Sequence, residues 1–156
     1  MNLIKDFDTV IVDLDFTIWH GSQPQIWAKS LVSPCSLTED RITDTNGDYL
    51  RLDSEVRDIF PKIQNLGFIT RGGLLNVPFD SQPPVQCLKV FGIFSYFTYC
   101  RHVLYCTDNK GSVLLPQGRT LYIDDLERDL RSVQELHPDV TCINRNLFKS
   151  WKELLA

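Results

Sequence analysis

Five short apolar runs, separated by helical or irregular segments, are the feature that most constrains the fold of this 156-residue chain. They read as strands and cover residues 9–12, 68–70, 102–106, 119–125 and 139–143. Strands that alternate with helices favour a parallel sheet with helices on both faces. The sequence therefore predicts an α/β fold, a Rossmann-like three-layer sandwich around a central, mostly parallel sheet, in a single domain over residues 1–156.

The segments between these runs carry recognisable start and stop signals. Asn46-Gly47 lies between two short apolar runs in "DRITDTNGDYLRL", which predicts a β-hairpin. Ser54 is the expected N-cap of the next helix and Gly67 the residue that ends it. Further helices are predicted at residues 85–94, 126–136 and 147–156. Residues 107–111 read as a polar loop, and no full helix is expected before the fourth strand.

Composition and the absence of targeting segments argue against several classes of protein. A net charge of −4 and a pI near 5.3 argue against a broad nucleic-acid surface. The cysteine count is odd and no pair has CxxC spacing, so neither a disulfide framework nor a zinc site is expected from Cys35, Cys87, Cys100, Cys106 and Cys142. The start "MNLIKDFD" lacks the apolar core of a signal segment, and no run is long enough to span a bilayer. We therefore expect a cytoplasmic protein.

Polar side chains lie at or just beyond the ends of four of the five predicted strands. They are, in chain order, Asp13 and Asp15, then Thr70 and Arg71, then Lys110, then Asp124 and Asp125. Alone, each has an ordinary explanation as a turn residue, a helix cap or a solvated charge. Ligands of such sheets bind beyond the carboxyl ends of the strands, so we expect these residues to share one site.

The chemistry of this set points to a metal and a phosphate. Clustered carboxylates repel one another unless a cation neutralises them. Hard oxygen ligands of this kind select Mg²⁺, which often shares its coordination with a phosphate. Thr70 and Lys110 supply hydrogen-bond donors for an anion. Mg²⁺ beside anion donors is the arrangement of a phosphoryl-transfer site.

Four stretches resemble the motifs of the haloacid dehalogenase superfamily of phosphohydrolases. "VIVDLDFTIW" is similar to its first motif, an apolar strand followed by D-x-D-x-T, and "LYIDDLERDL" to its acidic fourth motif. Thr70 and Lys110 fall at the second and third motifs. The magnesium-dependent phosphatase-1 group is closer still, because it shares Trp19, Arg71, the hairpin and the "VTCI" stretch.

The resemblance implies a role for each site residue. Asp13 would be the nucleophile that forms an aspartyl-phosphate, and Asp15 would protonate the leaving oxygen and then activate water. Thr70, Arg71 and Lys110 would bind the substrate phosphate. Mg²⁺ would be held by Asp13, the backbone carbonyl of Asp15, and Asp125, with Asp124 binding it through water or supporting these ligands. Asp129 takes the place of a residue that supports the metal ligands.

The chain departs from the group's pattern at three places. The second motif reads Thr-Arg-Gly-Gly rather than Ser-Arg-Thr, the segment at 110–124 is short, and Asp129 replaces a more usual Asn. None of these changes removes a required catalytic group.

The implied function is Mg²⁺-dependent hydrolysis of phosphomonoesters. A small cap at about residues 20–53 would leave the site open to a small phosphate ester or a phosphotyrosine protein. The alternatives are a nucleic-acid 3′-end or nucleotide phosphatase, a receiver-like signalling module and a catalytically silent phosphate-binding protein. Residues alone do not name the substrate, because such motifs serve many substrates.

Overall fold

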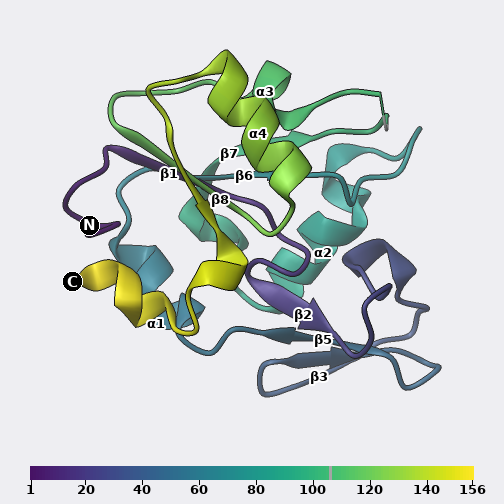
Figure 1. Cartoon of the computed structure of the whole chain (residues 1–156). Helices are drawn as coiled ribbons and strands as arrows, with labels where there is room; N and C mark the ends of the chain where they lie inside the picture. Colours follow the sequence, from purple (N-terminus) through teal and green to yellow (C-terminus); the bar gives the residue numbers. More distant parts are fainter. Residues whose placement is uncertain (106) are drawn as a thin grey trace.

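A computed structural model describes residues 1–105 and 107–156. Its centre is a five-stranded sheet in the order β7-β6-β1-β8-β9, in which every neighbouring pair is parallel (Figure 1). The strands are β1 Thr9–Val12, β6 Leu66–Thr70, β7 Phe97–His102, β8 Thr120–Asp124 and β9 Thr141–Asn144. The predicted α/β fold with a mostly parallel sheet is confirmed.

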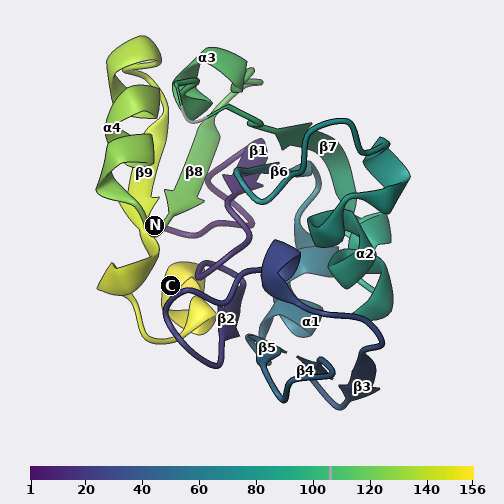
Figure 2. The same ribbon diagram turned by 90° about the vertical axis from the view of Figure 1, so that its right-hand side faces the viewer.

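Two hydrophobic cores lie on opposite faces of this sheet. The α-helices that cover it are α1 Val56–Ile59, α2 Pro83–Val90, α3 Lys110–Val113 and α4 Glu127–Leu136. Because successive strand residues point to opposite faces, Ile11 packs in one core with Val133 of α4, whereas Val12 packs in the other with Leu88 of α2. Figure 2 shows α3 and α4 on one side of the strands and α1 and α2 on the other.

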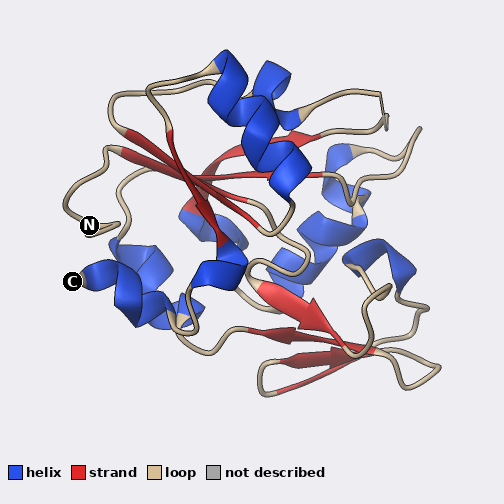
Figure 3. Cartoon of the chain, viewed as in Figure 1, coloured by secondary structure: helices blue, strands red, loops and turns tan. Residues whose placement is uncertain are grey.

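A second sheet forms from the chain that follows β1. It has four antiparallel strands in the order β2-β5-β4-β3, namely β2 Trp19–Gly21, β3 Ser36–Thr38, β4 Arg41–Thr43 and β5 Tyr49–Leu52 (Figure 3). The predicted hairpin is confirmed as β4 and β5. Gly47 in its turn has a φ of +85°, a conformation that favours glycine. The Asp44 carboxylate accepts hydrogen bonds from the amides of Asn46 and Asp48, each at 2.9 Å.

The helix predicted after the hairpin is much shorter than expected. α1 ends at Ile59 and continues only as a 3₁₀ turn, Phe60–Lys62, because Pro61 has no N–H to extend the α-helical ladder. Ser54 is not its N-cap; that position belongs to Glu55. Gly67 does not end the helix but lies inside β6, where a Cβ atom would come within 3.0 Å of the Tyr99 side chain.

The third predicted strand is displaced along the chain. β7 occupies Phe97–His102 rather than residues 102–106, because "FTYCRH" pairs in parallel with β6. Cys106, the last residue of the predicted run, lies outside the described residues. The predicted loop at 107–111 is wrong at its end, since α3 begins at Lys110 with the Asn109 side chain as its N-cap. As expected, the connection to β8 carries only this one short turn of helix over residues 107–119.

Other boundaries shift by a few residues. The helix predicted at 85–94 runs over Pro83–Val90, and Gly92 follows it with a φ of +74°. The predicted closing helix is a 3₁₀ turn, Trp151–Leu155. Cys35, Cys87, Cys100 and Cys142 are free thiols. Within residues 1–105 and 107–156, no helix combines the length and apolar character needed to cross a membrane.

Asp53, which follows β5, links the second sheet to the C-terminal segment. Its Oδ2 accepts hydrogen bonds from Arg145 Nη2 at 2.9 Å and Trp151 Nε1 at 2.8 Å, and His20 Nδ1 lies 3.3 Å from its Oδ1. Burial opposes the charged form, but the bonds from His20, Trp151 and Arg145 outweigh it and lower the pKa of Asp53. Arg145 also donates to the carbonyls of Thr17 and Phe148.

The substitution Asp53→Asn should lower the free energy of unfolding by about 2 kcal/mol at pH 7, because it leaves the buried Arg145 without its carboxylate. Because the pKa of Asp53 is lower in the folded state, its ionised form stabilises the fold above the unfolded pKa of about 3.9, and this stability is lost as pH falls through the folded pKa. The difference between parent and variant should therefore shrink below about pH 4. Urea denaturation at neutral and acidic pH measures this.

Asp80→Asn is the matched control, because Asp80 pairs with Lys89 at 3.4 Å on the surface and its side chain is 80% exposed. We expect it to change stability by less than about 0.5 kcal/mol. If Asp53→Asn lowers the free energy of unfolding no more than Asp80→Asn does, or if its effect does not depend on pH, the stabilising role of the Asp53–Arg145 ion pair is wrong.

Candidate active site

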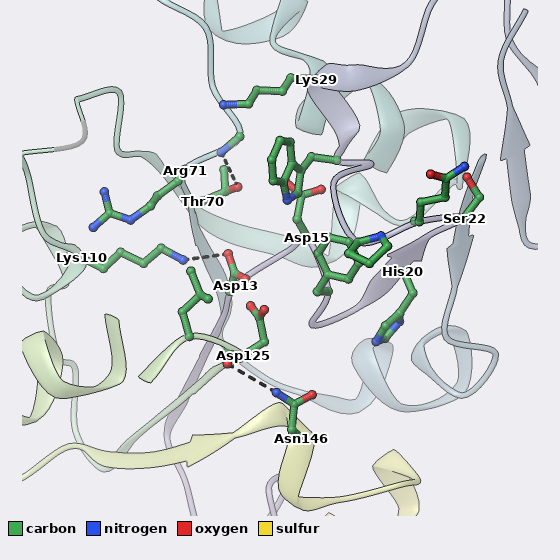
Figure 4. Close-up of a pocket in the computed structure, with 17 residues that line it drawn as sticks. Asp13, Asp15, His20, Ser22, Lys29, Thr70, Arg71, Lys110, Asp125 and Asn146 are labelled. Carbon is green, nitrogen blue, oxygen red and sulfur yellow. Dashed lines mark hydrogen bonds and ion pairs between the residues drawn. The ribbon is translucent and has the colours of Figure 1, made fainter. Parts of the chain in front are cut away.

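A cavity of about 750 Å³ opens at the carboxyl ends of β1, β6 and β8 (Figure 4). The sheet side contributes six of the seven predicted site residues, Asp13, Asp15, Thr70, Arg71, Lys110 and Asp125. Residues at and after β2 form the facing wall, among them His20, Ser22, Trp27 and Lys29. Asp124 does not line the cavity and is fully buried. The structure thus brings the strand-end residues together from four separate parts of the chain.

Lys110 is the centre of the buried charge network. Its Nζ lies 2.8 Å from Asp13 Oδ1 and 2.8 Å from Asp124 Oδ2, and the side chain is 1% exposed. Burial opposes its charge, but the carboxylates of Asp124, Asp13 and Asp129 outweigh burial and raise the pKa of Lys110. The residue therefore carries a fixed ammonium group beside Asp13 rather than the solvated charge that a polar loop would give it.

Asp13 lies directly after β1 and is 5% exposed. Its Oδ2 accepts a hydrogen bond from Thr17 Oγ1 at 3.2 Å. Burial, together with the charge of Asp124, raises the pKa of Asp13 despite the contact with Lys110. Burial also raises the pKa of Asp125 to about 6. The chain alone thus leaves negative charge in this site incompletely compensated.

The donor set fits a hard divalent cation. Asp13, Asp124 and Asp125 each offer a carboxylate oxygen, and these oxygens all lie within 4.8 Å of one another. Such oxygen ligands suit Mg²⁺, and a cation among them would relieve the repulsion that disfavours their charged forms.

Asp124 differs from its two neighbours because its oxygens already have donors. Oδ2 accepts from Lys110 and from the Tyr122 hydroxyl, and Oδ1 accepts from the Leu126 amide at 3.1 Å. Burial opposes its ionisation, but Lys110 outweighs burial and the pKa of Asp124 is lowered. Asp124 is thus bonded to Lys110 through one carboxylate oxygen and to the Leu126 amide through the other.

Asp15 is held from the facing wall. Its Oδ1 accepts hydrogen bonds from Trp19 Nε1 at 2.8 Å and from the Ala28 amide at 2.9 Å. Burial raises the pKa of Asp15 despite both bonds. Phe16 has a φ of 61°, so the chain turns sharply directly after this carboxylate.

The Asp15 side chain closely approaches Gly72 in the turn after β6. A Cβ atom on Gly72 would lie 3.0 Å from Asp15 Oδ2 and 3.2 Å from Thr70 Oγ1. The Thr70 hydroxyl accepts a hydrogen bond from the Gly72 amide at 3.0 Å, which leaves its own proton for another acceptor.

Arg71 has a partner inside the protein. Its Nη2 lies 2.8 Å from Asp129 Oδ1 and donates to the Asp108 carbonyl at 2.8 Å, and Figure 4 shows the guanidinium directed away from Asp13 and Asp15. Asp129, the unusual residue at this position, thus neutralises Arg71 and lies 3.7 Å from Lys110. A contact between Arg71 and substrate phosphate stays a prediction.

Several contributors to the site were not assigned from the sequence. Thr17 is the Thr of D-x-D-x-T, and Tyr122 lies two residues before Asp124, on the same face of the same strand. The sequence pattern could therefore have identified both residues. The Ala28 amide and Lys29 had none, because their positions depend on how the irregular chain after β2 folds.

One comparison with curated proteins bears on this site. The chain is 24% identical over 141 residues to magnesium-dependent phosphatase 1 of Homo sapiens, and the match covers 86% of this chain and 75% of that protein. No protein-family model matches the chain. The predicted resemblance to this kind of phosphatase is confirmed as a distant similarity over most of the chain.

Proposed function

We propose that this protein is a Mg²⁺-dependent phosphatase that hydrolyses phosphate monoesters through an aspartyl-phosphate on Asp13. The observation that carries the proposal is the placing of Asp13: its carboxylate lies 2.8 Å from the ammonium of Lys110, among the carboxylates of Asp124 and Asp125, and lines an open cavity. The similarity to a protein named for magnesium-dependent phosphatase activity supports the coarser part of this proposal, a phosphatase that uses Mg²⁺.

In this proposal Asp13, Asp125 and the backbone carbonyl of Asp15 bind the metal. Asp124 instead holds the ammonium group of Lys110 in place. When bound, Mg²⁺ would neutralise the carboxylates and the phosphate dianion and so favour attack of one anion on another. The raised pKa values of Asp13 and Asp125 agree with a site built for a cation.

In the first half of the reaction, a carboxylate oxygen of Asp13 attacks phosphorus. The new oxygen–phosphorus bond forms as the ester bond to the leaving oxygen breaks, and Asp15 gives its proton to that oxygen. Lys110 and the Thr70 hydroxyl stabilise the negative charge on the phosphoryl oxygens. The burial of Asp15 and its raised pKa favour the protonated form that this step requires.

In the second half, Asp15 acts as the base. Its carboxylate takes a proton from water, the water oxygen attacks phosphorus, and the bond to Asp13 breaks to release phosphate. The bonds from Trp19 and Ala28 hold Asp15 in one orientation for both steps. Asp129, itself paired with Arg71, lies 3.7 Å from Lys110 and supports its charge.

We infer that the segment at residues 20–53 serves as a small cap within a single domain. It supplies one wall of the cavity and two of its four strands are the predicted hairpin. Because this cap leaves the cavity open, a small phosphate ester or a phosphotyrosine side chain on a protein can reach Asp13.

The direct test is hydrolysis of p-nitrophenyl phosphate by the purified chain. We expect turnover with Mg²⁺, loss of turnover with a chelator, and recovery when excess Mg²⁺ is restored. Phosphate release that persists in the chelator, or no release with Mg²⁺, would reject the proposal.

Trp19→Phe tests the positioning of Asp15. The ring is fully buried against Phe91, and phenylalanine keeps an aromatic side chain but removes the Nε1 donor to Asp15. We expect kcat to fall about tenfold with little change in KM, since one bond to the proton-transferring group is lost.

Trp151→Phe is the matched control, because it removes an equivalent indole donor from Asp53 instead. It should cost a similar amount of stability and leave kcat unchanged. Equal kcat values for the two variants would argue against a positioning role for Trp19.

A further inference from the structure

We infer that the substrate's leaving group carries a second anionic group, such as a carboxylate or phosphate, and that Lys29 binds it. This inference rests on the proposed function and names the substrate class of the same site. It makes Lys29 a specificity-determining residue rather than a catalytic one.

Asp15 fixes where the leaving group must lie. In the proposed reaction this residue gives its proton to the leaving oxygen, so the rest of the leaving group extends past its carboxylate. The Ala28 amide bonds to that carboxylate at 2.9 Å, and Lys29 is the next residue in the same 3₁₀ turn, Ala28–Ser30. Lys29 also lines the cavity, and Figure 4 places it across the site from Asp125.

Lys29 differs from the other positively charged side chains of the cavity wall in its ion pairing. Lys110 is paired with Asp13 and Asp124, and Arg71 is paired with Asp129. His20, also in the wall, lies 3.3 Å from Asp53. Within residues 1–105 and 107–156, Lys29 has no carboxylate within 4.0 Å, and its ammonium lies 5.7 Å from the Trp27 ring centroid. Among the wall cations that the structure describes, Lys29 is the one without an ion-pair partner, although its charge also acts on Asp15 and opposes the rise in the pKa of that residue.

An exposed lysine is often only a solvated charge, and the position of this one argues for more. The cavity wall holds the carboxylates of Asp13, Asp15 and Asp125, which would repel an anionic leaving group. A lysine one residue from the amide that holds Asp15 offsets that repulsion where the leaving group enters. An uncharged leaving group would gain nothing from it.

The experiment compares two esters that differ in one group. 3-Phosphoglycerate has a carboxylate where glycerol 3-phosphate has a hydroxymethyl group. We measure the ratio of their kcat/KM values with Mg²⁺ for the parent, Lys29→Gln, Lys29→Arg and Lys62→Gln. Lys62 is an exposed lysine that does not line the cavity.

We expect the ratio to fall about tenfold in Lys29→Gln, because a charge-assisted contact is lost for one ester only. It should be kept in Lys29→Arg and in Lys62→Gln, and in the parent it should decline as salt is raised. A ratio unchanged in Lys29→Gln, even if both rates fall, would overturn the inference.

Parent turnover separates this inference from the function on which it rests. If p-nitrophenyl phosphate is hydrolysed but the carboxylate ester gains nothing from Lys29, only the inference fails. If the parent hydrolyses none of the three esters with Mg²⁺, the proposed function fails.

Discussion

Replacing Asp13 by asparagine will reduce kcat for p-nitrophenyl phosphate by a factor of about 10³ or more. The amide keeps the size of the side chain but is not a nucleophile, so the route through a covalent intermediate is lost. The fold should survive, because Asp13 is a buried group with a raised pKa and asparagine removes a charge that is costly there.

Thermal unfolding and circular dichroism check that Asp13→Asn is folded. A loss of activity can then be attributed to the missing nucleophile rather than to unfolding. Asp80→Asn makes the same chemical change at an exposed site and should keep parental activity. An Asp13→Asn variant within tenfold of the parent would mean that another group attacks phosphorus.

Lys110→Met will impair both activity and stability. Methionine approximates the volume of the lysine stem but has no charge, so Asp13, Asp124 and Asp129 lose the cation they share. Leaving buried carboxylates uncompensated should cost about 2–4 kcal/mol of folding free energy. We expect kcat to fall by about 10²–10³, because the donor beside the phosphoryl group is gone.

Lys89→Met is the control for this second substitution, since Lys89 makes only a surface ion pair at 3.4 Å with Asp80. Its stability should change by less than about 0.5 kcal/mol. Urea denaturation and steady-state kinetics on both variants give the comparison. A stable, active Lys110→Met protein would show that Lys110 has no role in catalysis.

The sequence was informative about the fold where side-chain pattern decides structure. β1 and β8 are buried runs whose periodicity and polar ends are readable, and the Asn46-Gly47 hairpin follows from turn chemistry. β7 was misplaced because two adjacent stretches have similar strand propensity, and only pairing with β6 selects between them. α1 was overextended because its apolar spacing outweighed the break that Pro61 makes.

The site was predictable to the extent that it depends on strand ends. Parallel strands deliver their last residues to one edge, so Asp13, Thr70 and Asp125 were placed together correctly. The partner of Arg71 could not be foreseen, since its contact with Asp129 depends on how β6 and α4 are placed relative to each other. The same holds for the Ala28 amide, which comes from irregular chain.

The most direct test of the proposed covalent mechanism is to locate the phosphoryl group on the enzyme. The variant Asp15→Asn should still be phosphorylated by p-nitrophenyl phosphate, whose leaving group needs little protonation, but should lose the base that hydrolyses the intermediate. After an acid quench, mass spectrometry of peptides should find one phosphoryl group on Asp13. A receiver-like module would instead keep a long-lived phosphoaspartate in the parent. Turnover with no phosphorylated peptide in either protein, or a phosphoryl group on a residue other than Asp13, would contradict the proposed aspartyl-phosphate on Asp13.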